Sequence, residues 1–276
     1  MAKIIDGRAI ADKLLQKLKE DIEIRGLKLA VAVVQVGGNA VSDVYLKEKE
    51  KACEKAGIKF VLLKFPETVS NDVLADEIKS LDRRPDINGI VVQLPLPKTI
   101  DSQRILNCVS LKKDIDCLSE AAVGRVYART STIMPPVVGA ISKILQECEA
   151  RLKEKNVVIV GAGRLVGKPA VLWFLNQGAT VSVVNESTRD ISFFTKNADI
   201  LISGVGKAKL INGNIVKEKA IVIDAGSSVE NGKTLGDVDF ESVIKKAGWI
   251  TPVPGGVGPL AVACLLENIL KLNSGL

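Results

Sequence analysis

Apolar and polar residues in the first half of the chain follow two different periods. Residues 29–36 and 58–63 are short, β-branched apolar runs of the kind that forms buried strands. Residues 71–81 instead repeat apolar positions every three or four residues, which predicts an amphipathic helix. The further elements expected here are a helix capped by Asp6, a helix over 42–56 and a strand over 89–92. This strand–helix order favours a parallel sheet with right-handed crossovers.

The second half of the chain repeats the same rhythm. Its pattern predicts strands at 156–160, 180–184, 198–203, 220–224 and 249–251, and helices at 137–152, at 165–176 and from Leu260 onward. A chain of 276 residues is long enough for about two domains of ordinary size. We therefore expect an α/β fold of two domains.

Composition and charge narrow the possible partners. The chain is 47% hydrophobic, has no apolar run of about 18 residues and begins without an apolar region of signal-peptide type. Five scattered cysteines without a C-x-x-C pair argue against a disulfide framework or a zinc site, and they favour the reducing cytoplasm. The net charge is +6, but Lys and Arg are interspersed with Asp and Glu rather than clustered, so we expect no nucleic-acid binding. Because no apolar run is long enough to span a bilayer, we also expect no membrane binding. A mild positive field suits an anionic small molecule.

The absence of histidine from the whole chain removes one class of catalysis. Histidine triads, histidine-ligated metals and histidine acid–base chemistry are excluded. Proton transfer must therefore use Lys, Asp, Glu, Tyr, Cys or water, and we expect no metal.

Residues 252–259 read Pro-Val-Pro-Gly-Gly-Val-Gly-Pro, which cannot form a regular helix or strand. Proline fixes φ and removes a donor, and glycine permits positive φ and close approach of a ligand. An ordinary turn needs only about two to four such residues. The length of this run favours a rigid functional loop against which a flat ligand could lie.

A glycine-rich turn follows the strand expected at 156–160. Gly161, Gly163 and Gly167 have the spacing G-x-G-x-x-x-G, one residue longer than the common dinucleotide fingerprint. Backbone N–H groups and a helix N-terminus there could bind a pyrophosphate, although a plain strand–helix connection is the alternative. Glu186, about 25 residues further on, lies where an acid contacts the ribose hydroxyls of NAD and would repel the extra phosphate of NADP. It could equally be an exposed loop glutamate.

Candidate catalytic side chains gather in the first half. Ser42, Tyr45 and Lys49 share one face of a helix, although most such faces are solvated. Tyr45 could stack on a planar ring, and Lys49 could deliver an amine to it. Gln93 ends an apolar strand at its carboxyl end, where ligands bind in parallel sheets, and it would be costly there without a partner. Asp116 lies near the expected junction of the two halves, and alone it would pass as a loop residue.

Taken together, these segments resemble one family over nearly the whole chain. The motifs are Ser42-x-x-Tyr45-x-x-x-Lys49, Val92-Gln93-Leu94-Pro95-Leu96-Pro97, Lys113-Asp114-Ile115-Asp116, the turn from Gly161 to Pro169, Gly236-Asp237-Val238 and the loop from Ile250 to Pro259. They recur in this order in the bifunctional methylenetetrahydrofolate dehydrogenase/methenyltetrahydrofolate cyclohydrolase family. The resemblance implies a folate-binding catalytic domain of residues 1–138 and 257–276, with the C-terminal helix packing back on it. It implies a Rossmann-type NAD(P)-binding domain of residues 139–256, a folate site in the cleft between domains and a homodimer.

The activity implied by the resemblance is NADP-dependent oxidation of 5,10-methylenetetrahydrofolate, followed by hydrolysis to 10-formyltetrahydrofolate. This places the chain in one-carbon metabolism and purine biosynthesis. By the same analogy Lys49 is the essential amine, Gln93 holds it, Tyr45 stacks on the folate and Asp116 hydrogen-bonds the pterin. The other implied folate contacts are Val92, Leu94, Pro254, Gly255, Gly256 and Pro259. The implied cofactor contacts are Gly161, Ala162, Gly163, Val166, Gly167, Glu186, Gly206, Ser227 and Gly256.

The sequence departs from the family pattern, mostly on the cofactor side. Gly163 stands for a serine, Asn185-Glu186 for a His-Ser or Arg-bearing segment, Ser227-Ser228 for Ile-Asn, Ala261 for a threonine, Met134-Pro135-Pro136-Val137 for Pro-Cys-Thr-Pro, and Cys117-Leu118 for glycine and an aromatic residue. Glu186 keeps NAD open as the cofactor. Three other functions stay open: a cyclohydrolase with weakened dehydrogenase activity, a folate-binding protein without activity, and a different nicotinamide oxidoreductase. The pair Lys49 and Gln93 argues against mere binding, and the loop 252–259 argues against the last.

Overall fold

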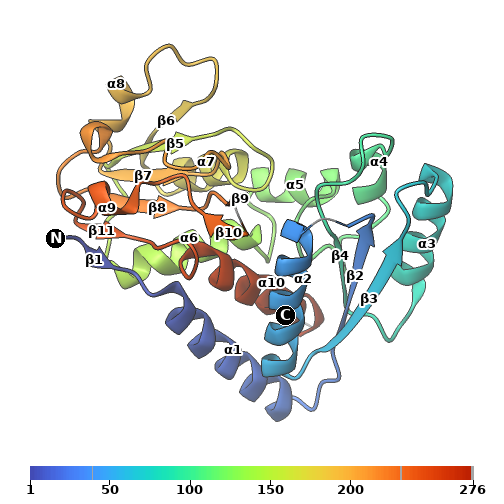
Figure 1. Cartoon of the computed structure of the whole chain (residues 1–276). Coiled ribbons are helices and arrows are strands. Elements are labelled where there is room, and N and C mark those ends of the chain that lie inside the picture. The colour runs from blue at the N-terminus through green and yellow to red at the C-terminus, as the bar shows by residue number, and fades with distance from the viewer. Residues whose placement is uncertain (39, 231, 275–276) are drawn as a thin grey trace. The chain divides into compact units, whose positions relative to one another are not determined.

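The computed structural model describes residues 1–38, 40–230 and 232–274, and it divides into two compact units (Figure 1). The three-stranded unit comprises Asp12–Pro136 and Val262–Leu276, and the six-stranded unit comprises Met1–Ala11 and Val137–Ala261. The two-domain α/β architecture is therefore confirmed. The first eleven residues were expected in the catalytic domain but belong to the six-stranded unit. The reason is that a two-residue strand at Lys3–Ile4 pairs with the larger sheet.

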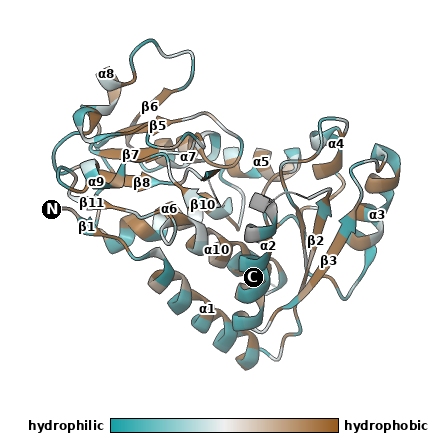
Figure 2. Ribbon diagram, in the orientation of Figure 1, coloured by the Kyte–Doolittle hydropathy of each residue, from teal (hydrophilic) through white to brown (hydrophobic). Residues whose placement is uncertain are grey.

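In the three-stranded unit, the central strand β2 lies between β3 and β4 in a parallel sheet. The strands are β2 (Ala30–Val36), β3 (Lys59–Phe65) and β4 (Gly89–Val92), and the helices of this part of the chain are α1 (Gly7–Ile24), α2 (Ala40–Ala56), α3 (Asn71–Arg83), α4 (Ser102–Leu106), α5 (Glu120–Tyr127) and α10 (Val257–Asn273). Every residue of β2 is buried, as expected for the middle of a parallel sheet, and most of β2 is brown in Figure 2.

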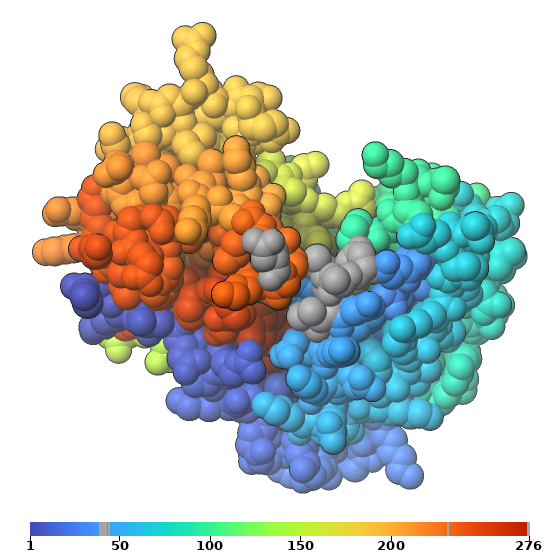
Figure 3. Space-filling model, viewed as in Figure 1, coloured from blue at the N-terminus to red at the C-terminus, as the bar shows by residue number. Residues whose placement is uncertain are grey.

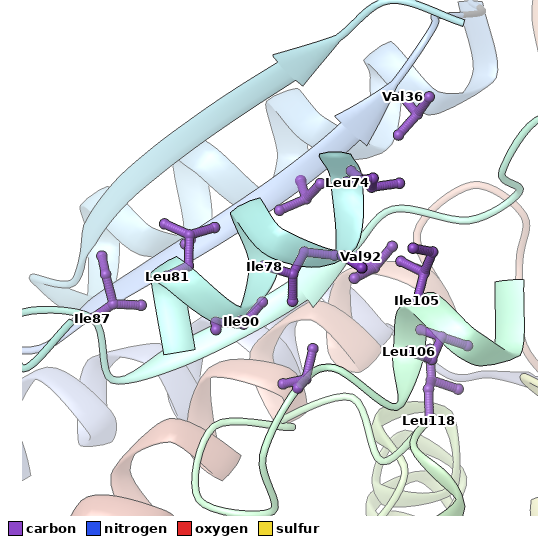
Figure 4. Close-up of a cluster of buried hydrophobic side chains, with 14 of the residues drawn as sticks. Val36, Leu74, Ile78, Leu81, Ile87, Ile90, Val92, Ile105, Leu106 and Leu118 are labelled. Carbon is purple, nitrogen blue, oxygen red and sulfur yellow. The ribbon is translucent and has the colours of Figure 1, made fainter. Parts of the chain in front are cut away.

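A cluster of buried apolar side chains fixes the end of β4 (Figure 4). Leu74, Ile78 and Leu81 recur along one side of α3 and pack in the same cluster as Ile90 and Val92 of β4. Burial of each such side chain contributes roughly 1.5–3 kcal/mol relative to exposure. The position at which the next residue, a glutamine, leaves the strand is therefore set by the core.

The six-stranded unit contains a fully parallel sheet with the order β1-β11-β8-β7-β5-β6. Its strands are β1 (Lys3–Ile4), β5 (Asn156–Val160), β6 (Thr180–Val184), β7 (Ile200–Ser203), β8 (Ile221–Asp224) and β11 (Trp249–Ile250). The other elements here are α6 (Pro136–Glu147), α7 (Gly167–Asn176), α8 (Ser192–Thr195), the 3-10 helix η1 (Gly213–Ile215), α9 (Phe240–Val243) and a hairpin of β9 (Ser228–Glu230) and β10 (Lys233–Leu235). A parallel sheet of this kind carries ligands at the carboxyl ends of its strands.

The predicted elements agree with most of these bounds. The helix predicted over 137–152 ends earlier, at Glu147, because Glu149 adopts a φ of 51° and the Ala150 N–H returns to the Leu145 carbonyl. The predicted packing of the last helix on the first domain is confirmed, since the Asn268 amide donates to the Ile115 carbonyl oxygen at 2.9 Å. Periodicity does not predict the short elements β1, α4, α5, α8, α9, β9 and β10, which carry too few residues to show a period.

Candidate functional site

Helix α2 carries Tyr45 and Lys49 one turn apart on a partly buried face. Lys47 and Glu50 point the other way and are exposed, so the shared face predicted from the sequence is not the solvated one. The side chain of Ser42 lies outside the described part of the structure. The helix follows Gly37, whose φ of 65° lets the chain turn out of β2.

Lys49 forms a hydrogen bond with Gln93, the residue that directly follows β4. Its Nζ donates a hydrogen bond to Oε1 of Gln93 at 2.8 Å. The Gln93 Nε2 donates to the carbonyl oxygen of Leu94 at 2.8 Å, and this second bond keeps the amide oxygen turned toward the amine. The Gln93 backbone N–H donates to the Val34 carbonyl oxygen at 2.8 Å, which ties the residue to the sheet. The amide is thus held at both ends.

Burial moves both ionisable groups of this site toward their neutral forms, and the charge that each places on the other opposes the shift. Burial lowers the pKa of the Lys49 ammonium, and the charges of Asp116 and then Cys53 oppose that shift. Burial raises the pKa of Asp116 to about 6, with Lys49 opposing and Asp114 adding to the rise. A lowered pKa increases the fraction of the amine that is neutral, and the neutral amine is the form that acts as a general base.

A turn held by a buried carboxylate presents Asp116. Asp114 accepts hydrogen bonds from the backbone N–H of Leu118 at 3.1 Å and of Ser119 at 2.8 Å. Asp114 also pairs through its backbone with Ile90 of β4, which anchors the turn to the sheet. The sequence reasoning gave Asp114 no role; its one signal was a second carboxylate two residues before Asp116.

The residue after Asp116 is conformationally strained. Cys117 is 3% exposed and has a φ of 58°, in the left-handed region that favours glycine. The family pattern has glycine at this position, so the strain is the structural consequence of a departure noted in the sequence.

The other two predicted folate contacts at this end of β4, Val92 and Leu94, differ in their exposure to solvent. Val92 is buried in the apolar core, so its side chain faces away from solvent, and Leu94 is partly buried against the same core. The Leu94–Pro95 peptide is cis.

The glycine turn after β5 has the features of a phosphate cradle. Gly161 has a φ of 100°, and a Cβ on Gly167 would overlap the Gly161 carbonyl oxygen. A Cβ on Gly163 would meet nothing within 4 Å, so that position opens to free space. Helix α7 begins at Gly167, and its N-cap residue, the partly buried Val166, makes no side-chain capping bond. In the first turn of α7 the Lys168 N–H donates to the Gly163 carbonyl oxygen at 3.0 Å and Pro169 has no N–H, so this turn offers a phosphate its glycine backbone rather than a row of free helix N–H groups.

Two further loops lie at the same edge of the sheet. The Gly204 carbonyl oxygen lies 2.9 Å from where a Cβ on Gly161 would sit, so the loop after β7 adjoins the turn, of which Ala162 is also part. Gly206 has a φ of 75°, and a Cβ on it would lie 3.5 Å from the Ser227 carbonyl oxygen. The Ser227 hydroxyl is buried without a hydrogen-bond partner among the described residues. A buried hydroxyl without a partner, in a segment that adjoins Gly206, fits a polar ligand at this edge of the sheet.

Glu186 lies in an exposed loop between β6 and α8, coloured gold, which stands out from the surface of its unit (Figures 1 and 3). The loop closes on itself, since Asn185 Oδ1 accepts the Ser187 N–H and the Asn185 N–H donates to Thr188 Oγ1, both at 3.0 Å. The strand β6 that leads into it pairs with β5, which leads into the glycine turn.

The proline- and glycine-rich loop belongs to the six-stranded unit. The Val253–Pro254 peptide is cis, and Gly255 has a φ of 107°. A Cβ on Gly256 would lie 2.5 Å from the Pro252 carbonyl oxygen. Helix α10 begins at Val257, earlier than predicted, with Pro259 in its first turn. The roles of Pro254, Gly255, Gly256 and Pro259 as folate contacts stay predictions.

A metal site and a membrane-spanning helix would each leave a recognisable feature in the described part of the structure. No group of three or more His, Cys, Asp or Glu side chains there could hold a metal ion. None of the helices described has the length and apolar character that crossing a membrane requires.

Comparison with known proteins agrees with this geometry. The model of the tetrahydrofolate dehydrogenase/cyclohydrolase catalytic domain matches residues 5–116, and the model of its NAD(P)-binding domain matches residues 135–275. The chain belongs to the tetrahydrofolate dehydrogenase/cyclohydrolase family. The resemblance seen in the motifs is thereby confirmed.

Relatives within the family match over their full length. The chain is 42% identical over 272 residues to the bifunctional protein FolD of Nautilia profundicola, which covers 97% of this chain and 96% of that one. The structure of the bifunctional FolD enzyme of Campylobacter jejuni has a TM-score of 0.95 at 39% identity and covers 100% of both chains. FolD of Trypanosoma brucei, solved with NADP and an inhibitor, has a TM-score of 0.94 at 33% identity and covers 98% of this chain and 97% of that one.

Proposed function

We propose that this chain oxidises 5,10-methylenetetrahydrofolate with a nicotinamide dinucleotide and hydrolyses the 5,10-methenyltetrahydrofolate that results to 10-formyltetrahydrofolate. The observation that carries this proposal is the bond from Lys49 to Gln93, in which a buried amine of lowered pKa is held at a defined place. Membership of the tetrahydrofolate dehydrogenase/cyclohydrolase family supports it.

In the hydrolytic step, water adds to the methenyl carbon and one carbon–nitrogen bond breaks. Neutral Lys49 accepts a proton from the attacking water, and its ammonium form returns that proton to the departing nitrogen. The overall reaction consumes one water and releases one proton, because the methenyl cation becomes a neutral formamide. Gln93 orients the amine through its carbonyl oxygen in both states, although the hydrogen bond is stronger to the ammonium.

The folate is held by groups next to the amine. The Asp116 carboxylate pairs with the amino-pyrimidine edge of the pterin, and it is ionised above its pKa of about 6. Tyr45 supplies an aromatic face on which a planar ring can stack. Both residues lie in the three-stranded unit with Lys49.

The six-stranded unit holds the dinucleotide. The backbone of Gly161, Ala162, Gly163 and Gly167 binds its phosphates. Val166, Gly206, Gly256 and the Ser227 hydroxyl line the same region, and Glu186 contacts the ribose. When bound, NADP or NAD supplies the oxidising power of the dehydrogenase step. Glu186 favours NAD, because its carboxylate repels a 2′-phosphate.

A second function, cyclohydrolase with weakened dehydrogenase activity, has an observation in its favour. The altered residues Gly163, Asn185, Ser227, Ser228 and Ala261 lie in the six-stranded unit, whereas Lys49 and its partners do not. We also propose a cytoplasmic homodimer that serves one-carbon metabolism and purine biosynthesis without binding nucleic acid or membranes. Light scattering after gel filtration tests the dimer.

The deciding experiment follows the absorbance of 5,10-methylenetetrahydrofolate and its products with the purified protein, with NADP and with NAD in parallel. Turnover with either dinucleotide, together with hydrolysis of added methenyltetrahydrofolate, supports the bifunctional enzyme. Hydrolysis alone supports the second function. A protein that performs neither reaction contradicts both.

A further inference from the structure

Two buried carboxylates lie at the carboxyl edge of the six-stranded sheet, and the proposed reactions use neither. Asp237 is 0% exposed and Asp224 is 2% exposed. A buried carboxylate is costly unless hydrogen-bond donors surround it. The hydrogen-bond donors around Asp237 and Asp224 therefore show which backbone segments the two carboxylates hold in place.

Asp237 receives three hydrogen bonds from one short segment. Its Oδ2 accepts from the Ser203 hydroxyl and from the Val205 N–H, both at 2.7 Å, and its Oδ1 accepts from the Lys207 N–H at 2.8 Å. Val205, Gly206 and Lys207 are exposed, so these bonds attach an exposed loop to a buried anchor.

Asp224 completes the anchor from the neighbouring strand. Its Oδ1 accepts from the Gly226 N–H and its Oδ2 from the Val238 N–H, both at 2.9 Å. A Cβ on Gly226 would overlap the Asp237 carboxylate, and one on Gly236 would overlap the Asp224 carboxylate. The two acids and two glycines therefore pack as one unit that joins three loops.

The anchored loop adjoins the glycine turn. Strands β5 and β7 are neighbours, with Val160 opposite Ser203, so the segments that follow them emerge side by side. The Val205 Cγ2 atom lies 3.1 Å from where a Cβ on Gly161 would sit. In parallel α/β sheets this is the edge at which dinucleotides bind. The exposed Val205 side chain is available to pack against one.

We propose that Asp237 is a positioning residue for the dinucleotide. Its carboxylate holds the backbone of Val205, Gly206 and Lys207 in the form that receives the cofactor beside the Gly161 turn. It does not itself touch the cofactor, because the loop's own donors occupy both of its oxygens. The inference rests on the proposed dinucleotide-binding function of this unit.

The variant Asp237→Asn tests the proposal. It keeps the shape of the side chain but turns one acceptor oxygen into an NH2 donor, which must face either the Ser203 and Val205 donors or the Lys207 N–H. We expect the Kd of the preferred dinucleotide, measured by isothermal titration calorimetry, to rise about ten-fold or more. The KM for the dinucleotide should rise in parallel, whereas kcat at saturation should stay within about three-fold.

Two controls separate positioning from general damage. Hydrolysis of methenyltetrahydrofolate needs no dinucleotide and uses residues of the three-stranded unit, so its rate should stay within about two-fold. Asp239→Asn makes the same change two residues further on. Asp239 makes no side-chain capping bond to α9, so this variant should leave the Kd unchanged.

An unchanged Kd in a folded Asp237→Asn protein overturns the proposal. If that variant does not fold, Ser203→Ala decides, because it removes one donor and keeps the carboxylate. A rise in Kd of about three-fold supports the proposal there, and no rise overturns it. If the unmodified protein binds neither NADP nor NAD, the dehydrogenase function and this inference both fail. Normal binding by the unmodified protein with no change in the variants rejects the inference alone.

Discussion

The two units present their functional groups in different ways. In the three-stranded unit the chemistry lies in side chains that hold one another, as Lys49 and Gln93 do at 2.8 Å. In the six-stranded unit the candidate site is mostly backbone. It is formed by the Gly161 turn and by the loop of Val205 to Lys207, whose N–H groups donate to Asp237. A side-chain site loses its chemistry when one member changes, whereas a backbone site survives changes in the exposed side chains around it.

This difference explains where the sequence departs from the family's motifs. Tyr45, Lys49, Gln93 and Asp116 are all present, whereas Gly163 and Glu186 replace side chains of the cofactor shell. A Cβ on Gly163 would meet nothing, and Glu186 is exposed, so neither change disturbs the fold of the turn or loop. The altered positions leave the backbone of the glycine turn intact, and under the function proposed above they set the preference between NADP and NAD.

The largest effect expected is the loss of hydrolysis in Lys49→Met. General acid–base groups typically contribute 10²–10⁴-fold, so we expect the cyclohydrolase rate to fall about 10³-fold while folate still binds. Lys51→Met is the matched control on the same helix, because Lys51 is exposed and its contact among the described residues is a surface ion pair with Glu48 at 3.3 Å. Full hydrolysis by Lys49→Met, measured as the decay of methenyltetrahydrofolate, would remove Lys49 from the mechanism.

The next effect concerns the buried carboxylate of Asp116, whose pKa rises from 3.8 to about 6 in the folded protein. The folded state then binds this proton more tightly than the unfolded state, so the ionised group destabilises the fold fully above pH 6 and not at all below about pH 4. Asp116→Asn should therefore stabilise the protein by about 3 kcal/mol at pH 8. Urea denaturation at pH 8 and pH 4 measures the difference, which should vanish at the lower pH.

The same titration predicts the pH dependence of folate binding. Below pH 6 the Asp116 carboxylate becomes protonated and loses its charge. The KM for 5,10-methylenetetrahydrofolate should therefore rise as the pH falls through 6. Asp116→Asn should have a high KM at every pH. A KM that is independent of pH between 5 and 8 in the unmodified protein would contradict the role given to Asp116.

Sequence reasoning reached further into one unit than into the other. The helix face of Tyr45 and Lys49 and the strand end at Gln93 follow from local periods, whereas the roles given to Lys49 and Gln93 came from the family resemblance. The contact between Lys49 and Gln93 spans 44 residues and depends on the pairing of β2 with β4, so local pattern alone could not show it. Family resemblance linked the two residues before the geometry did.

What the sequence could not indicate was mainly buried polar structure. Asp114 and Asp237 occur within recognised motifs, yet nothing local distinguishes a buried carboxylate from a loop residue. Their functions depend on N–H donors from segments brought in by the fold. Strand β1 was missed for a similar reason, since two residues carry no period and its pairing partner lies near residue 250.

A smaller effect, on the preference between NADP and NAD, is expected at Glu186. Glu186→Gln removes the charge that repels a 2′-phosphate, so the ratio of kcat/KM with NADP to that with NAD should rise roughly two- to five-fold, the range of an exposed charge interaction. The change should shrink at high ionic strength because salt screens exposed charges. Glu218→Gln, exposed just before the amino end of β8, is the control and should not move the ratio. A larger ratio in Glu218→Gln would show that net charge, not position, sets cofactor preference.

The smallest effect tests the one strained departure in the three-stranded unit. Cys117 has a φ of 58° and a buried side chain that packs with Ala122 and Ile133. Cys117→Gly relieves the left-handed strain but loses the buried sulfur, and each effect is worth about 1 kcal/mol, so the net change should be small. Cys117→Ala loses the sulfur and keeps the strain, so it should be less stable than Cys117→Gly by about 1 kcal/mol in urea denaturation. Equal stability of the two variants would mean that the turn relaxes in solution. Because the Asp114 bonds keep Asp116 in place, both variants should hydrolyse methenyltetrahydrofolate at rates close to that of the unmodified protein.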